Sequence, residues 1–203
     1  MPSSLRKINL LYTLNMKFLL VDNYNDKNKI KNLENFLLKY GSVDTVNFAK
    51  LYPPFFDVFK YDCVVLSGSS IIPIMYNDEM FLEEIDLIKE INIPIIGICF
   101  GFELLAYAYG NKLEPLKNKI HGIHNVDYMN AENQTHTYKV WENHNWILKS
   151  VKNFDVLGKS KFGIEVLEHK SKKFYGLQFH PEYPENQNFG YLIFNDILKR
   201  IRS

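Results

Sequence analysis

The chain has 203 residues, of which 46% are hydrophobic and 23% charged, so we expect a folded protein with a sizeable core. Its 24 basic residues nearly balance its 23 acidic ones, and no cluster of lysine or arginine indicates nucleic-acid binding. No stretch reaches the roughly 18 apolar residues of a membrane span. These features predict neither a nucleic-acid nor a membrane partner.

The N-terminal segment, residues 1–15, has a short apolar patch but neither a long apolar core nor a small-residue cleavage site. We interpret it as an N-terminal extension rather than a signal peptide. Residues 16–203 contain no repeat, linker or low-complexity stretch, which favours one domain. The two cysteines are too few for a disulfide framework, and this usage fits a reducing, cytoplasmic location.

The first half of the chain alternates strand and helix patterns. Short apolar runs predict strands at residues 17–22, 43–48, 61–66 and 93–98. Helical periodicity predicts helices at residues 26–39, 77–91 and 101–109. We expect Gly41 and Gly110 to end the first and third helices, and Asn77 or Asp78 to cap the second. Such alternation is typical of a parallel sheet with helices on both faces, whose ligands bind beyond the carboxyl ends of the strands.

The second half changes character, because short strand-like runs follow one another with polar turns between them. They lie at residues 120–129, 137–141, 155–157, 164–168 and 174–179. A last helical pattern covers residues 188–201. The sequence therefore predicts an α/β fold: a mostly parallel open sheet with helices on both faces and a mixed or antiparallel extension in the second half.

Cys99 ends a buried strand and lies between Gly97 and Gly101 in the stretch GICFG. A sharp strand-to-helix turn presents a nucleophile to a cleft, flanking glycines relieve crowding, and a helix N-terminus favours a thiolate. A small core residue is the alternative for Cys99, as we expect for Cys63. A nucleophilic role requires a base.

The best candidate base is His180 in the stretch FYGLQFHPE, residues 174–182. It follows the last predicted strand at the edge where Cys99 emerges. Glu182 comes two residues later and could hold one imidazole nitrogen, which leaves the other to accept the thiol proton. Cys99, His180 and Glu182 are thus the predicted catalytic residues.

The motif GICFG, followed by YGLQFHPE at residues 175–182, closely resembles the class I (triad-type) glutamine amidotransferase family, and the order of elements matches over residues 17–182. The resemblance implies that Cys99 attacks the side-chain amide of glutamine through a thioester, with His180 as general base and acid and Glu182 as its partner. Glutamate and ammonia would be the products, and no cofactor is implied.

Two further stretches fit this resemblance. The loop LSGSS, residues 66–70, stands where the family builds an oxyanion hole, which implies backbone donors at Gly68 and Ser69 beside the Phe100 amide. The family usually has two glycines followed by proline there. The segment ENHNW, residues 142–146, resembles the family's substrate-binding segment; a polar turn with a packed tryptophan is the alternative. Its candidate binding residues are Asn143, His144, Asn145 and Trp146.

Glu103 departs from the family pattern, which has glutamine at this position to contact the amino-acid part of the substrate. A glutamate could still accept a hydrogen bond from the α-ammonium group. The string GFEL, residues 101–104, and HNW, residues 144–146, instead resemble γ-glutamyl hydrolases of the same superfamily. By contrast, residues 166–182 look more like the amidotransferase component of GMP synthase.

Three functions remain open on the sequence. The first is a glutaminase that passes ammonia to a separate synthetase, such as the ATP pyrophosphatase subunit of a GMP synthase, since the chain has no P-loop. The second is a γ-glutamyl hydrolase or peptidase acting alone, and the third is a catalytically silent regulatory protein of the same fold. No metal site is expected, because His121 and His124 lie in a strand-like stretch where they would not converge.

Overall fold

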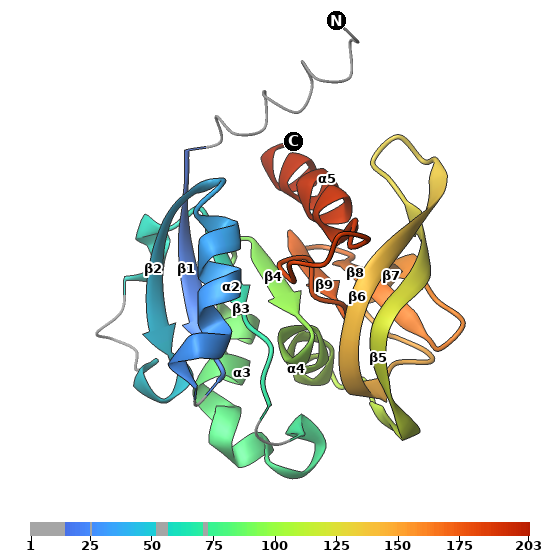
Figure 1. The fold of residues 1–203 in the computed structure, drawn as a ribbon. Coiled ribbons are helices and arrows are strands. Elements are labelled where there is room, and N and C mark those ends of the chain that lie inside the picture. The colour runs from blue at the N-terminus through green and yellow to red at the C-terminus, as the bar shows by residue number, and fades with distance from the viewer. Residues whose placement is uncertain (1–14, 25, 52–56, 71–72) are drawn as a thin grey trace, which may run out of the picture.

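The computed structural model describes residues 15–24, 26–51, 57–70 and 73–203. All but the last residue of the expected N-terminal extension therefore lies outside the described residues. The described part of the chain forms one nine-stranded sheet in the order β2-β1-β3-β4-β9-β8-β7-β5-β6 (Figure 1). The strands are β1 (Met16–Asp22), β2 (Gly41–Asn47), β3 (Cys63–Leu66), β4 (Ile95–Ile98), β5 (Glu114–Met129), β6 (Thr135–Ile147), β7 (Phe154–Lys159), β8 (Ile164–His169) and β9 (Phe174–Leu177).

The sheet divides into a parallel and an antiparallel part. Strands β2, β1, β3, β4 and β9 pair in parallel, whereas β9, β8, β7, β5 and β6 pair antiparallel. This arrangement confirms the predicted fold class. The last short strand, β9, joins the parallel part although it lies far along the chain, so its carboxyl end lies beside that of β4.

Helices cover both faces of the parallel part. They are α2 (Lys27–Leu37), α3 (Leu82–Glu90), α4 (Phe100–Ala108) and α5 (Gly190–Arg202). Alternate residues of β1 enter different cores: Phe18 and Leu20 pack with α2 and α5, and Leu19 and Val21 pack with α3 and α4. Burial on both faces explains why β1 is apolar throughout. No helix in the described ranges is long and apolar enough to cross a membrane.

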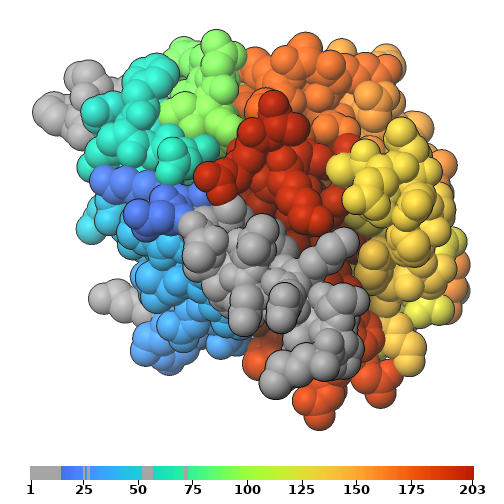
Figure 2. Space-filling model, turned by 90° about the horizontal axis from the view of Figure 1, so that it is seen from above, coloured from blue at the N-terminus to red at the C-terminus, as the bar shows by residue number. Residues whose placement is uncertain are grey.

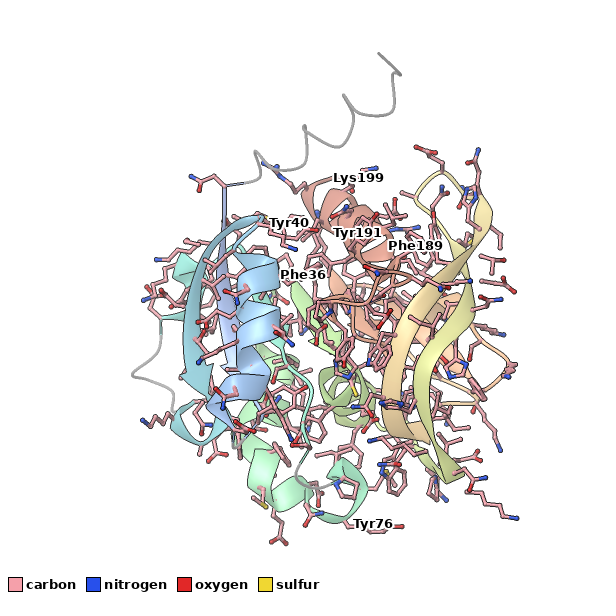
Figure 3. The ribbon with its side chains drawn as sticks, viewed as in Figure 1. Phe36, Tyr40, Tyr76, Phe189, Tyr191 and Lys199 are labelled. Atoms are coloured by element: carbon pink, nitrogen blue, oxygen red, sulfur yellow. The ribbon has the colours of Figure 1, made fainter. Side chains whose placement is uncertain are left out.

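Aromatic side chains join α5 to α2. Phe36 and Tyr40 lie between the two helices in Figure 3, and their rings lie 5.0 and 5.4 Å from that of Phe194. The Tyr40 hydroxyl also donates to Asn195 Oδ1 at 2.7 Å. In Figure 2, α5 lies between the N-terminal half of the sheet and the β5–β6 hairpin. The C-terminal helix therefore packs back on the sheet, as its apolar periodicity predicts.

Two boundary predictions in the first half are wrong. Gly41 does not cap α2, because the helix ends earlier, with Leu38 as its C-cap, and Gly41 already opens β2. The predicted helix at residues 77–91 is divided into a 3₁₀ turn, Asp78–Phe81, and α3. Asn77 occupies the N-cap position of this turn, but its side chain donates to the Pro73 carbonyl and makes no capping hydrogen bond.

The antiparallel strands are longer than the sequence indicates. The hairpin of β5 and β6 runs from residue 114 to 147, and segment 142–146 lies inside β6 rather than in a polar turn. Its alternation of buried Glu142 and His144 with less buried Asn143 and Asn145 is that of a strand with one covered face. The sequence did not predict this strand, because its buried positions are polar and strands are recognised by alternating apolar residues.

Glu84 of α3 should make stability depend on pH. The carboxyl group is buried and accepts a hydrogen bond from Asn23 Nδ2 at 3.2 Å. Burial raises its pKa to about 8, against the opposing effect of the Asn23 bond. Because this folded-state pKa exceeds the unfolded value of about 4.3, the stabilisation is complete below that value and is lost as pH rises toward about 8.

We expect Glu84→Gln to remove this loss, since the amide does not ionise. The free energy of unfolding, measured by urea denaturation, should fall less in this variant than in the parent between about pH 5 and pH 8. Asp86→Asn, on the exposed face of the same helix, is the matched control and should keep the parent's slope. Equal slopes for parent and Glu84→Gln would contradict the assignment.

Candidate active site

Cys99 stands at the turn between β4 and α4. Its backbone has φ 52° and ψ −103°, a left-handed conformation that is strained for a residue with a side chain. The Cys99 amide donates to the Leu177 carbonyl at 2.7 Å, which extends the pairing of β4 and β9 past the strand end. A side chain on Gly101 would overlap the Leu66 carbonyl. Glycine at this position therefore allows α4 to begin directly against β3.

His180 emerges three residues after β9, beside Cys99. Its amide donates to the Trp141 carbonyl at 2.8 Å, and its Nδ1 lies 2.8 Å from Glu182 Oε1. The side chains of His180 and Glu182 are only 9% and 8% exposed. Because Nδ1 is bonded to the carboxylate, Nε2 is the ring nitrogen that can accept the proton of the Cys99 thiol. The structure thus brings the three predicted catalytic residues together at one edge of the sheet.

The electrostatics of the three groups raise the pKa values of both the acid, Cys99, and the base, His180. Burial alone would lower the pKa of His180, but the charges of Glu182 and Cys99 and hydrogen bonds to both outweigh it and raise that pKa well above its usual value. Burial raises the pKa of the Cys99 thiol, whereas His180 opposes the rise through its charge and a side-chain hydrogen bond. His180, whose raised pKa makes it a stronger base, therefore lies beside the Cys99 thiol, whose raised pKa means that it requires a base to lose its proton.

The loop after β3 approaches this base closely. A side chain on Gly68 would overlap the Tyr24 hydroxyl and would lie 3.1 Å from His180 Cε1, so a larger residue here would require the Tyr24 side chain to move. The Ser67 carbonyl accepts a hydrogen bond from the Gly101 amide at 3.1 Å, which ties the loop to the first turn of α4. Gly68 thus lies against His180, and Ser69 and Phe100 line the same cavity as Cys99. First-turn amides such as that of Phe100 have no partner within their helix.

We expect Gly68→Ala to lower the rate of a reaction catalysed by Cys99 and His180 roughly 10–100-fold, because small misplacements of catalytic groups have effects of this size. The new methyl group must displace the Tyr24 hydroxyl and makes a tight contact with the His180 ring. The double variant Tyr24→Phe/Gly68→Ala loses the nearest obstructing atom and should recover part of the activity. Steady-state turnover measures both variants, and full activity of the single variant would contradict the close packing.

A cavity of about 210 Å³ opens next to Cys99. Asn143 places its carbonyl 3.9 Å from Cys99 Sγ. Trp146 packs edge-to-face with Tyr76 at 5.7 Å between ring centroids. The predicted site residues that line this cavity are Ser69, Cys99, Phe100, Glu103, Asn143, His144, Asn145 and Trp146. A larger hollow of about 910 Å³ lies on β5, β6 and β7, and its lining contains none of the predicted site residues.

Glu103 lies at the base of this cavity in the first turn of α4. It is 4% exposed, and Gln178 Nε2 donates to its Oε1 at 3.2 Å. Burial raises its pKa to about 8, while the Gln178 bond and the charge of His180 oppose the rise. The group that departs from the family pattern is therefore a buried carboxyl that can carry a proton near neutral pH.

Sequence reasoning missed three residues of the site. Tyr24 lies against Gly68, and Lys119 of β5 lines the cavity as its one cationic side chain among the described lining residues. Asn188 is buried and donates to the His180 carbonyl at 2.9 Å. A tyrosine just after β1 is at the edge where ligands bind, which is the one signal the sequence offers. Lys119 and Asn188 reach the site only through tertiary packing.

Comparison with known proteins identifies the family. The family model of class-I glutamine amidotransferases matches residues 19–200. One subunit of a glutamine-hydrolysing GMP synthase from Saccharolobus solfataricus is 28% identical over 158 residues, which cover 72% of this chain and 80% of that protein. A GMP synthase from Dictyostelium discoideum is 32% identical over 122 residues, and this match spans 54% of the chain but only 17% of the larger relative.

A solved structure agrees with these matches. The crystal structure of a putative GMP synthase subunit from Thermoplasma acidophilum superposes with a TM-score of 0.78 at 26% sequence identity. The alignment covers 92% of this chain and 94% of that one. The chain therefore belongs to the class-I glutamine amidotransferase family.

Proposed function

We propose that this protein hydrolyses the side-chain amide of glutamine to glutamate and ammonia with a Cys99–His180–Glu182 triad. The observation that carries the proposal is the buried 2.8 Å contact between His180 Nδ1 and Glu182 Oε1 beside the strained, helix-initiating Cys99. Membership of the family and the relatedness to GMP synthase subunits support the same chemistry.

In the proposed reaction His180 accepts the proton of the Cys99 thiol as sulfur attacks the amide carbon of glutamine. The resulting oxyanion is stabilised by the Phe100 amide and by the backbone of Gly68 and Ser69. Collapse of this intermediate breaks the C–N bond, and His180 returns the proton to the leaving ammonia. A water molecule then attacks the thioester while His180 takes its proton, which releases glutamate and restores the thiol.

Glu103 and Lys119 supply complementary groups for the amino-acid end of the substrate, because an α-ammonium group bound beside Glu103 would lower its raised pKa and favour the carboxylate. Both line the cavity, and we assign Glu103 to the α-ammonium group and Lys119 to the α-carboxylate. The polar side chains of Asn143 and Asn145, with the Trp146 ring, complete the lining. A glutamate at position 103 would by itself repel the substrate carboxylate, and the positive charge of Lys119 on β5 offsets this repulsion.

A γ-glutamyl hydrolase is the second candidate, because the string GFEL around Glu103 resembles those enzymes. Their substrates carry a γ-glutamyl group, which is also the group that glutamine would transfer to Cys99. The cavity favours glutamine: about 210 Å³ is smaller than the roughly 300–1,000 Å³ of pockets that enclose drug-sized ligands. Glu103 also selects for a free α-ammonium group, which internal residues of folate polyglutamates lack. We therefore rank free glutamine first and N-terminal γ-glutamyl peptides second.

A substrate panel tests this ranking. Glutamate release should be fastest from glutamine, slower from γ-glutamyl dipeptides and undetectable from folate polyglutamates. Lys119→Ala should raise KM for glutamine roughly 10-fold or more with a smaller effect on kcat, because a charge-assisted contact to the substrate is lost. Lys117→Ala, an exposed lysine of the same strand outside the cavity, is the matched control. Preference for polyglutamates would reverse the assignment.

We also infer that the ammonia is used by a synthetase partner and that residues 16–203 act as one amidotransferase domain. The relatives that are named as single subunits of a GMP synthase support this inference, and the partner would then resemble the ATP pyrophosphatase subunit of that enzyme. Glutaminase activity that rises in the presence of such a synthetase would support the pairing, and an unchanged rate with no complex on gel filtration would oppose it.

A further inference from the structure

Two glutamates and a histidine meet inside the antiparallel part of the fold. Glu142 and His144 come from β6, and Glu165 comes from β8. These strands are not neighbours in the sheet, but both reach the segment after β9: Trp141 accepts a hydrogen bond from His180, and Glu165 accepts one from Gln178. One potential ligand atom from each of the three side chains lies within 4.8 Å of the others.

All three side chains are removed from solvent. Glu142 and Glu165 are 0% exposed and His144 is 3% exposed. Within the described part of the chain, neither glutamate forms an ion pair with lysine or arginine. Burying carboxylates without a compensating cation is costly, so the cluster needs a source of positive charge.

The hydrogen bonds leave acceptor atoms facing one another. The His144 Nδ1 lies 2.8 Å from the Trp146 carbonyl, which can only accept, so Nδ1 carries the proton. In a neutral ring, Nε2 then presents a lone pair to Glu142 Oε2 at 3.2 Å. Glu142 Oε1 and Glu165 Oε2 are buried without a hydrogen-bond partner among the described residues. In this tautomer, with both glutamates ionised, the three side chains present only lone pairs to one another.

We propose that Glu142, His144 and Glu165 form a binding site for a divalent transition-metal ion, with Zn²⁺ as the preferred ion. One imidazole nitrogen and two carboxylate oxygens are ligands of the type that Zn²⁺ takes, and two carboxylates neutralise its charge. A ligating histidine that donates its other N–H to a backbone carbonyl is the usual outer-shell arrangement. His144 also lines the cavity, which provides an entry path and space for a water ligand.

The ion would have a structural role, because no step of the proposed hydrolysis uses it. Glu142 and His144 flank Asn143, whose carbonyl lies 3.9 Å from Cys99 Sγ. Anchoring both neighbours to one ion would fix this stretch of β6 against the catalytic cysteine. The inference does not rest on the proposed function, since metal binding and thermal stability can be measured without any substrate.

Zinc titration of the chelator-treated full chain tests the site. Isothermal titration calorimetry should show one equivalent bound, and Zn²⁺ should raise the melting temperature. Glu165→Gln and Glu142→Gln should each weaken binding by more than the roughly 10–100-fold that loss of an outer-shell partner costs. Glu132→Gln, in the exposed turn between β5 and β6, is the matched control and should bind as the parent does.

Exposed histidines are the main source of adventitious binding. His121→Ala and His136→Ala, at two exposed histidines, should therefore keep the parent's affinity, and loss of binding in either would overturn the proposal. No binding to the parent chain would also overturn it and would show that shared protons hold the cluster together. Should the glutamine variants fail to fold, Co²⁺ on the parent chain decides: four- or five-coordinate visible bands support the site, and octahedral bands oppose it.

Discussion

Replacement of Cys99 by alanine is expected to lower kcat for glutamine hydrolysis by at least about 1,000-fold, since loss of a covalent nucleophile leaves only binding and oxyanion stabilisation. The other cysteine cannot substitute, because Cys63 is fully buried in β3 and packs in the core with α2 and α5. Glutamate release measures the loss, and circular dichroism confirms the fold. Activity within about 10-fold of the parent would refute the triad and favour a different nucleophile.

A companion variant separates catalysis from strain. Cys99 has φ 52°, a conformation that costs roughly 1–3 kcal/mol for a residue with a side chain and is open to glycine. Cys99→Gly should therefore be as inactive as Cys99→Ala but should unfold at a higher urea concentration. A silent regulatory protein would instead retain its biological role in both variants, which distinguishes it from the proposed enzyme.

The second large effect is expected from Glu182→Gln. The carboxylate holds His180 Nδ1 at 2.8 Å and raises the pKa of this histidine. Its loss should lower kcat by about 10²–10⁴-fold, as misorientation of a triad histidine does. The pKa of His180 should fall at the same time, so the acid limb of the kcat/KM profile should move to lower pH, because less alkaline solution then deprotonates the base.

The matched control is Glu185→Gln, an exposed acid three residues along the same loop. It removes the same charge without touching His180 and should leave both kcat and the acid limb unchanged. An acid limb that stays in place in Glu182→Gln, or moves to higher pH, would mean that Glu182 does not orient the base. Profiles of kcat/KM against pH for the parent and both variants decide the matter.

Most of the parallel half of the fold was predictable from the sequence, because its strands are buried on both faces. The run KFLLVD predicts β1 almost residue for residue, and Cys99 and His180 stand out at strand ends where ligands bind. The predicted boundaries of helices and strands were wrong where local hydrogen bonds determine them. Gly41 opens a strand rather than ending a helix, and the Asn77 side chain bonds to Pro73 instead of capping.

The rest of the site depends on contacts between distant parts of the chain. Glu142 and Glu165 look like ordinary strand acids in the sequence, and only the approach of β6 and β8 to the segment after β9 buries them together. Lys119 reaches the cavity because β5 pairs with β6 around an irregular register. Sequence periodicity does not predict such contacts, because it indicates single helices and strands and not how they pack together.

The most direct test of the proposed chemistry is to trap the thioester. Rapid mixing of the protein with glutamine, followed by acid quench, proteolysis and mass spectrometry, should find a γ-glutamyl group on the peptide that contains Cys99. The parent chain is the sample for this test, because Glu182→Gln should slow the formation of the adduct as well as its hydrolysis. Glutamate formation without any adduct on Cys99, or an adduct on Cys63 alone, would contradict the proposed mechanism.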